Sequence, residues 1–157
     1  MQLSSRFPVA VQILIIIAWC PEDVKITSEL MARSVNTNPA LIRRILGYLK
    51  NAGLVNVAAG TGGTTLTRDA EKITLLDIYR AVELTNQSRL FGLHETTNSE
   101  CPIGRNINEV LTPHLEQARM ALEASLEEVT IEQLKKEFPP FNLAFWKNIM
   151  PSAINRL

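Results

Sequence analysis

Three segments decide the fold of this chain: Ala52-Gly53-Leu54-Val55, Gly60-Thr61-Gly62-Gly63-Thr64-Thr65-Leu66, and Ile73-Thr74-Leu75-Leu76-Asp77-Ile78-Tyr79-Arg80-Ala81-Val82-Glu83. The first is typical of a helix that ends at a glycine, which adopts a positive φ at little cost. The second has the glycines of a hairpin loop between strands predicted over 54–58 and 64–68. The third begins with a capping box and starts another helix. A helix, a two-stranded hairpin and a second helix, in this order, predict a winged helix.

The first predicted helix runs from Arg6 to Trp19, with Ser4 or Ser5 as its N-cap. It is apolar on nearly every side, so we expect it at the centre of the core. Its longest apolar run, 9–20, is interrupted by Gln12 and is shorter than the roughly 20 residues that span a bilayer. We therefore expect no membrane anchor, and the residues around the run lack the pattern of a signal peptide.

Two shorter helices follow and predict a helix-turn-helix. Thr27 is the expected cap of a helix over 28–33, and residues 35–37 form a tight turn. Asn38 then caps a third helix, in which Pro39 occupies the first position, where its missing N–H is not needed.

The third predicted helix has two different faces. Apolar side chains recur every three or four residues on one face, which we expect to be buried. Small and basic residues occupy the opposite face, which could therefore approach another surface closely. The apolar set is Ile42, Ile45, Leu46 and Leu49, and the opposite set is Ala40, Arg44, Gly47 and Asn51, with Arg43 and Lys50 on a flank.

The second half of the chain predicts one long helix that needs a partner. Pro102 opens it, and an apolar stripe continues for more than 25 residues, which is typical of a helix that pairs with another helix. Pro113 lies inside and predicts a kink or a break, with Thr112 as a local cap. The candidate dimerisation residues on the stripe are Ile103, Ile107, Leu111, Leu115, Ala118, Leu122 and Leu126.

A short capped helix and an aromatic tail complete the chain. Thr130 and Gln133 predict a capping box that starts a helix ending near Lys136. The tail is expected to pack on the body or on a partner subunit, because aromatic side chains are seldom left in solvent. The alternative is that Phe141, Phe145 and Trp146 line an effector pocket. Its aromatic residues are Phe138, Phe141, Phe145 and Trp146.

The predicted fold class is mainly α, with a small β-hairpin wing and a long dimerisation helix. Four parts are expected along the chain: a winged helix-turn-helix over 1–83, a connector and sensor loop over 84–101, the dimerisation helix over 102–130, and the tail over 131–157.

Charge and cysteine content narrow the class of function. The formal net charge is zero, but residues 25–68 contain six basic residues and one acidic residue, a local charge of +5. Residues 84–157 contain seven basic and nine acidic residues, a charge of −2. A local basic stripe suits a partner that carries phosphates.

Two cysteines provide no disulfide framework, so we expect a reducing, cytoplasmic setting.

The candidate DNA contacts lie mostly in the helix-turn-helix. Arg43 and Arg44 are expected to contact phosphate or guanine from the major groove, Arg44 being the better base reader, unless they form a solvated helix face. Thr37 and Asn38 lie where a backbone amide and a side chain can both meet a phosphate, although Asn38 serves equally well as a cap alone. The candidate backbone clamps, each equally well explained as plain surface, are Ser5, Arg6, Lys25 and Lys50.

In this order, the motifs resemble the Rrf2 family of bacterial transcription regulators. The resemblance covers nearly the whole chain and rests on the opening Met1-Gln2-Leu3-Ser4-Ser5-Arg6, on the segments 52–55, 62–63 and 73–83, and on Cys101-Pro102-Ile103 before the long helix. It implies a homodimer that places one winged helix-turn-helix on each half of a palindromic operator. The implied partners are double-stranded DNA, a second copy of the chain, and an unidentified small-molecule or redox signal.

Two features depart from the family pattern. Many members hold an iron–sulfur cluster with three cysteines in the loop before the dimerisation helix, but the loop here, Leu93 to Ile103, contains only Cys101. Cluster ligation normally uses several thiolates, so we expect no cofactor and no metal site. Some members carry a wing arginine for the minor groove where this chain has Ala59, so the resemblance does not extend to that contact.

The expected function is repression of transcription by a homodimer, with a signal at the 93–103 loop changing the angle between the two heads. One alternative is a thiol-based redox-sensing repressor that uses Cys101, because a helix N-terminus lowers the pKa of a thiol. The other interpretation of Cys101 is that its position only requires a small side chain. A second alternative is a winged-helix module that contacts proteins and not DNA, which the zero net charge favours. An enzyme is not expected, since the sequence lacks phosphate-loop, hydrolase and metalloprotease motifs.

Overall fold

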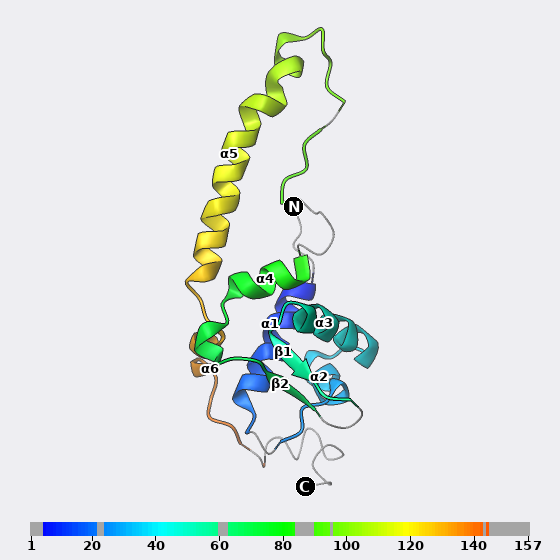
Figure 1. Cartoon of the computed structure of the whole chain (residues 1–157), viewed down its shortest axis with the longest axis vertical. Coiled ribbons are helices and arrows are strands. Elements are labelled where there is room, and N and C mark those ends of the chain that lie inside the picture. The colour runs from blue at the N-terminus through cyan, green and yellow to red at the C-terminus, as the bar shows by residue number, and fades with distance from the viewer. Residues whose placement is uncertain are drawn as a thin grey trace.

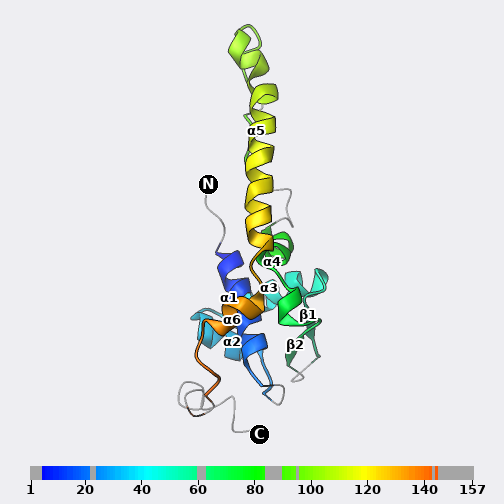
Figure 2. The same cartoon turned by 90° about the vertical axis from the view of Figure 1, so that its left-hand side faces the viewer.

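The computed structural model describes residues 5–21, 24–59, 63–83, 90–94, 96–142 and 144, which form a head and a long helical arm (Figure 1). The elements in chain order are α1 (Arg6–Trp19), α2 (Ser28–Val35), α3 (Pro39–Asn51), β1 (Val55–Val57), β2 (Thr64–Leu66), the 3₁₀ turn η1 (Ala70–Lys72), α4 (Leu75–Glu83), α5 (Pro102–Glu127) and α6 (Ile131–Lys136). Helix α5 extends away from the head in both views (Figures 1 and 2). Among the described residues, no helix is both long and apolar enough to cross a membrane.

The helix-turn-helix forms because its caps are local. The Thr27 hydroxyl accepts a hydrogen bond from the Leu30 N–H at 3.3 Å, and the Asn38 side chain accepts one from the Leu41 N–H at 2.9 Å. Between the helices, Asn36 adopts the left-handed conformation, with φ of 57°. Helix α2 continues to Val35, two residues further than predicted, because the residue that turns the chain is Asn36.

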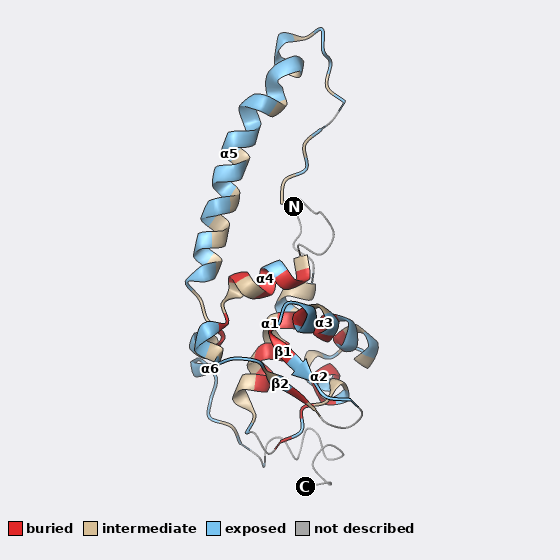
Figure 3. Ribbon diagram, viewed as in Figure 1, coloured by how far each residue is buried: buried red, intermediate tan, exposed pale blue. Residues whose placement is uncertain are grey.

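Helix α1 lies at the centre of the core, as its sequence predicts. Ala10, Ile13 and Leu14 are fully buried, and the helix contacts α2, α3, α4 and α6. Figure 3 shows the buried residues concentrated in the head, whereas the arm is exposed or half-buried. Ser5 occupies the expected N-cap position and its carbonyl accepts a bond from the Val9 N–H at 3.3 Å, but its dihedral angles are helical and its side chain makes no capping bond. Ser4 lies outside the described residues.

The wing is a two-stranded antiparallel sheet in which Val55 pairs with Leu66 and Val57 with Thr64. Both strands are shorter than predicted. One hydrogen bond continues past β2, from the Thr67 N–H to the Leu54 carbonyl at 3.2 Å. The Arg68 guanidinium then donates to the Lys72 carbonyl at 2.9 Å and pairs with Asp77 at 2.8 Å. On the other side of the wing, the Thr64 N–H donates to the Ile26 carbonyl at 2.9 Å, which ties the hairpin to the segment before α2. Gly60, Thr61 and Gly62 lie outside the described residues.

The arm is one continuous helix, which corrects the expected break at Pro113. Helix α5 runs through Pro113, and the expected cap Thr112 is interior: its hydroxyl donates to the Asn108 carbonyl at 2.5 Å. A capping side chain would instead accept a bond from a backbone N–H. The helix tolerates the proline because this stretch is exposed, so the backbone carbonyl that loses its partner is open to water.

The chain returns from the arm and closes onto the head. The Leu75 N–H donates to the Val129 carbonyl, and the Ile131 N–H donates to the Ile73 carbonyl, each at 2.9 Å. Thr130 and Gln133 form the predicted capping box at the start of α6. Ile131 is fully buried and joins the same core as α1, so α6 is part of the head.

Charged groups fix the base of the arm against α4. Arg80 on α4 pairs with Glu123 on α5 at 2.8 Å, and Glu123 also pairs with Arg119, which pairs in turn with Glu116 at 2.5 Å. These bonds, that from Arg80 first, hold the pKa of the Glu123 carboxyl below its ordinary value. The angle between the arm and the head therefore depends in part on one carboxylate shared by two arginines.

Candidate nucleic-acid interface

Helix α3 has the two faces that its sequence predicts. Ile42, Ile45 and Leu49 are fully buried and Leu46 is nearly so. The opposite residues Ala40, Arg44, Gly47 and Asn51, and the flanking Arg43 and Lys50, are all exposed. The structure thus presents a side of α3 that is small in its middle and basic around it.

Arg44 is held by a neighbour on its own helix. Its Nε donates to the Tyr48 hydroxyl at 3.0 Å, and its guanidinium carbon lies 6.0 Å from the centre of the Tyr48 ring. A guanidinium over an aromatic face gains cation–π attraction and keeps fewer rotamers. The contact with Tyr48 therefore restrains the Arg44 side chain and leaves its other N–H groups able to donate.

Arg43 is paired across the helix-turn-helix. Its guanidinium lies 2.5 Å from the Glu29 carboxylate of α2, and both side chains are more than half exposed. The pKa of Glu29 is lowered by its own backbone N–H first, and by Ser28 and Arg43 in addition. An exposed pair of this kind contributes only about 0–1 kcal/mol, so a phosphate can compete for Arg43.

In the turn before α3, two of the groups expected to meet a phosphate are already hydrogen-bonded within the protein. The Thr37 N–H donates to the Ala32 carbonyl at 2.9 Å, so this amide is engaged within the protein. The Asn38 Oδ1 is occupied by the cap bond to the Leu41 N–H. A phosphate at the start of α3 would therefore meet the side chains of Thr37 and Asn38 and not the Thr37 amide.

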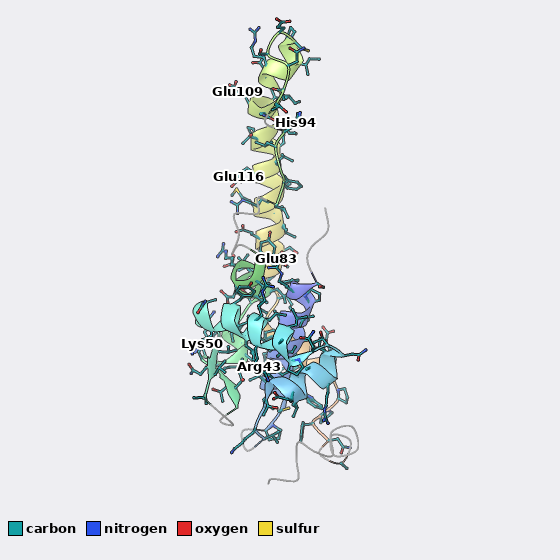
Figure 4. The ribbon with its side chains drawn as sticks, turned by 90° about the vertical axis from the view of Figure 1, so that its right-hand side faces the viewer. Arg43, Lys50, Glu83, His94, Glu109 and Glu116 are labelled. Carbon is teal, nitrogen blue, oxygen red and sulfur yellow. The ribbon has the colours of Figure 1, made fainter. Side chains whose placement is uncertain are left out.

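The remaining candidate contacts surround the head at different places. Ser5 and Lys25 are exposed and Arg6 is half-buried. Lys25 precedes Ile26, whose carbonyl binds the wing, so Lys25 lies beside the wing. Figure 4 shows Arg43 and Lys50 together on the α3 side of the head, with Glu83, Glu109 and Glu116 towards and along the arm. The local basic character found in the sequence is thus separated in space from these acidic groups.

Exposed apolar side chains follow the arm. Ile103 is 74% exposed, Val110 62% and Met120 61%, and none of the described residues of α5 is buried. Of the seven predicted dimerisation residues, Ile103, Ile107, Leu111 and Ala118 are exposed, and Leu115, Leu122 and Leu126 are half-buried. Val110 flanks this apolar surface beside Ile103 and Ile107, whereas Met120 lies on the opposite side of the helix.

The loop at the tip of the arm is built around Gly104. A Cβ atom at Gly104 would lie 2.4 Å from the Asn98 carbonyl oxygen, so only glycine fits beneath the loop. Cys101 occupies the cap position of α5, and the backbone N–H groups of Gly104 and then Ile103 lower the pKa of its thiol. The fold thus stabilises a thiolate at this position.

The donor atoms at the tip do not fit an iron–sulfur cluster held by three cysteines. The chain has one other thiol, Cys20, which is partly buried at the end of α1, where burial raises its pKa to about 12. Within the ranges that the structure describes, no three side chains of the metal-binding types lie close enough together to hold an ion. His94 contacts the Thr96 hydroxyl at 3.3 Å.

Two partners of the site were not anticipated from the sequence. Tyr48 is one helical turn from Arg44, and this four-residue spacing is a signal that could have revealed their contact. Glu29 is 14 residues from Arg43, and only the packing of α2 against α3 brings the two together.

Comparisons with known proteins agree with this architecture. Residues 3–137 match the Rrf2 family, described as an iron-dependent transcriptional regulator. YwnA of Bacillus subtilis strain 168, which carries the name of an HTH-type transcriptional regulator, is 38% identical over 132 residues, 84% of this chain and 96% of YwnA. A crystal structure of a protein described as DNA-binding is 35% identical, covers 83% of this chain and 98% of that chain, and has a TM-score of 0.67. CymR (YrzC), the global cysteine regulator of Bacillus subtilis, shares the fold at 21% identity, covering 88% of this chain and 99% of CymR, with a TM-score of 0.63.

Proposed function

The chain belongs to the Rrf2 family of transcriptional regulators, and from this premise we propose that it represses transcription by binding a palindromic DNA operator as a homodimer. The family and these relatives are regulators and not enzymes. The observation that carries the proposal is the exposed face of α3, which is small at Ala40 and Gly47 and flanked by Arg43, Arg44 and Lys50. A helix of this shape and charge fits the major groove.

Arg44 is the residue proposed to read a base. Its guanidinium has donors beyond the one bound to Tyr48, and Arg donates in a bidentate manner to guanine O6 and N7. Arg43 is proposed to exchange Glu29 for a phosphate, a contact that positions the helix without reading sequence. The residues proposed to contact the backbone with it are Ser5, Arg6, Lys25, Thr37, Asn38 and Lys50.

The arm supports the proposed homodimer. A helix of 26 residues with large apolar side chains exposed along it is stable in water mainly when another helix covers that surface. A second copy of α5 has the matching surface, because an isologous dimer places the same patch on both subunits. We propose that the dimer forms along the stripe from Ile103 to Leu126 and sets the spacing of the two heads.

The proposed regulator works without the three-cysteine iron–sulfur cluster of many family members, because its donor set holds a single thiol at the arm tip. One specific observation favours a second candidate, a thiol-based redox sensor. Cys101 is partly exposed, and backbone N–H groups lower its pKa, which favours the reactive thiolate. In this variant of the proposal, oxidation of Cys101 weakens operator binding and Cys101→Ser removes the response; unchanged affinity across peroxide, hypochlorite and quinone treatment would exclude it.

Selection of binding sites from a random DNA pool tests the recognition geometry. Two half-sites with centres about one helical turn apart are expected, because each dimer inserts two copies of α3. Arg44→Ala should relax the preference at one position in each half-site and weaken binding about tenfold or more. Lys136→Ala is the matched control: it removes an exposed charge on α6, which faces the opposite side from α3 (Figures 2 and 4).

Selection of no motif would contradict operator binding. A motif that Arg44→Ala and Lys136→Ala affect equally would contradict the role given to α3. Binding that does not weaken with salt would favour a module that contacts proteins, since release of counterions makes DNA binding strongly salt-dependent.

A further inference from the structure

The head contains an apolar groove of about 720 Å³. It lies between α1, the last turn of α2, α6 and the segment 138–139, and Figure 2 shows α6 beside α1. The volume is in the range of sites that hold small organic molecules, roughly 300–1,000 Å³. Its apolar lining comes mainly from Phe7, Val11, Ile15, Trp19, Leu134 and Phe138.

One end of the groove is held in shape by contacts distant in sequence. The Trp19 indole N–H donates to the Pro139 carbonyl at 2.8 Å, and the Trp19 ring meets Phe141 edge-on with centroids 4.9 Å apart. The groove therefore exists in the ligand-free structure, which reduces the ordering that a ligand must cause.

The polar groups of the groove come from the junction of α1 and α2. The Gln12 side-chain N–H donates to the Ser34 carbonyl at 3.1 Å and to its hydroxyl oxygen at 3.3 Å. Because that hydroxyl oxygen is an acceptor, its own proton points elsewhere. Arg33 is the charged residue of the lining, and no carboxylate in the described part of the chain pairs with it. The donors Arg33 and Ser34 thus stand beside an apolar surface.

We propose that this groove binds a small organic acid with an apolar, aromatic or aliphatic body. The body would displace water from the apolar lining, and the carboxylate would accept charge-assisted hydrogen bonds from Arg33 and a bond from Ser34. The lining contains no acidic side chain, so a cationic ligand would find no partner there.

The position of the groove gives such a ligand a route to the helix-turn-helix. Arg33 and Ser34 occupy the last turn of α2, directly before the Asn36 turn that leads into α3. A ligand bound there would contact both α1 and the end of α2. It would therefore change the position of α3 relative to α1. This consequence rests on the proposed operator binding, whereas ligand binding itself does not.

Calorimetric titration of the full chain without DNA tests the site, using 2-naphthaleneacetic acid and its neutral amide as probes. The acid should bind about fivefold more tightly than the amide, because only the acid pairs with Arg33. Arg33→Gln is a surface change that keeps the fold, and it should make the two affinities equal. Ile15→Trp, which fills the groove, should abolish binding of both probes. Arg105→Gln, which makes the same change at an exposed arginine in the first turn of α5 and outside the groove lining, should change neither affinity.

Three results would overturn the proposal. The first is equal affinity of the native chain for acid and amide, and the second is a preference for the acid that survives in Arg33→Gln. The third is absence of binding by either probe at about 1 mM, which would mean that another part of the chain or a second copy occupies the groove. A failure to bind operator DNA would leave all three readouts intact.

Discussion

Replacement of Gly47 by alanine should stabilise the fold and weaken DNA binding at the same time. Gly47 lies inside α3 on its exposed face, and a Cβ atom there would meet nothing within 4 Å. Glycine inside a helix costs about 0.5–1 kcal/mol relative to alanine. Gly47→Ala should therefore raise the free energy of unfolding by that amount and Tm by about 1–4 °C.

The same methyl group should interfere with a closely approaching DNA surface. Steric overlap at a packed contact costs about 1–3 kcal/mol, so the affinity for the operator should fall about tenfold. Gly53→Ala is the matched control. Its added Cβ would also meet nothing within 4 Å, but Gly53 has a φ of 70° and terminates α3, so alanine should cost about 1–2 kcal/mol of stability. Its operator affinity should stay close to native while it is folded.

Thermal unfolding followed by circular dichroism, and fluorescence anisotropy with the selected operator, measure the two effects. A lower Tm for Gly47→Ala would refute the conclusion that the fold does not need this glycine. A higher Tm with unchanged operator affinity would refute the close approach of this face of α3 to DNA.

Three further results are expected. In the folded protein, iodoacetamide should alkylate Cys101 with a midpoint below pH 9 and leave Cys20 largely unmodified until far higher pH; mass spectrometry that finds equal rates would contradict this. The pKa of Glu123 is lowered on folding, so its pairing with Arg80 stabilises the folded protein above pH 4.5, the ordinary carboxyl pKa, and this stabilisation is lost as pH falls further. Glu123→Gln should therefore reduce the fall in unfolding free energy below pH 4.5. An unchanged dependence of the unfolding free energy on pH would contradict this role of Glu123. Val110→Glu should yield monomers with a native helical spectrum in light scattering, whereas an intact dimer would exclude the arm as the interface.

The sequence predicts the caps of the head well because capping is local. Thr27, Asn38, Thr74 and Thr130 each bond within three residues along the chain, so spacing alone reveals them. Pro113 is different, because the sequence predicts either a kink or a break there and the structure excludes the break. Its effect depends on whether the surroundings can satisfy the carbonyl that loses its partner, and exposure of the arm makes this possible.

The candidate interface could be predicted in outline but not in its pairings. The period of the apolar residues in α3 places Arg44 and Gly47 on the exposed face, as the structure has them. The Thr37 N–H donates to the Ala32 carbonyl because Asn36 adopts the left-handed conformation. That conformation was not predicted from the sequence. The position and lining of the groove could not be predicted, because they depend on contacts such as that between Trp19 and Pro139, which are 120 residues apart.

Retention of genomic DNA by the purified protein at low and high salt, with sequencing of the bound fragments, tests the central claim most directly. The account predicts enrichment of a palindromic sequence, lost at high salt and in Arg44→Ala but kept in Lys136→Ala. Retention of random fragments, or of none, would contradict sequence-specific recognition by α3.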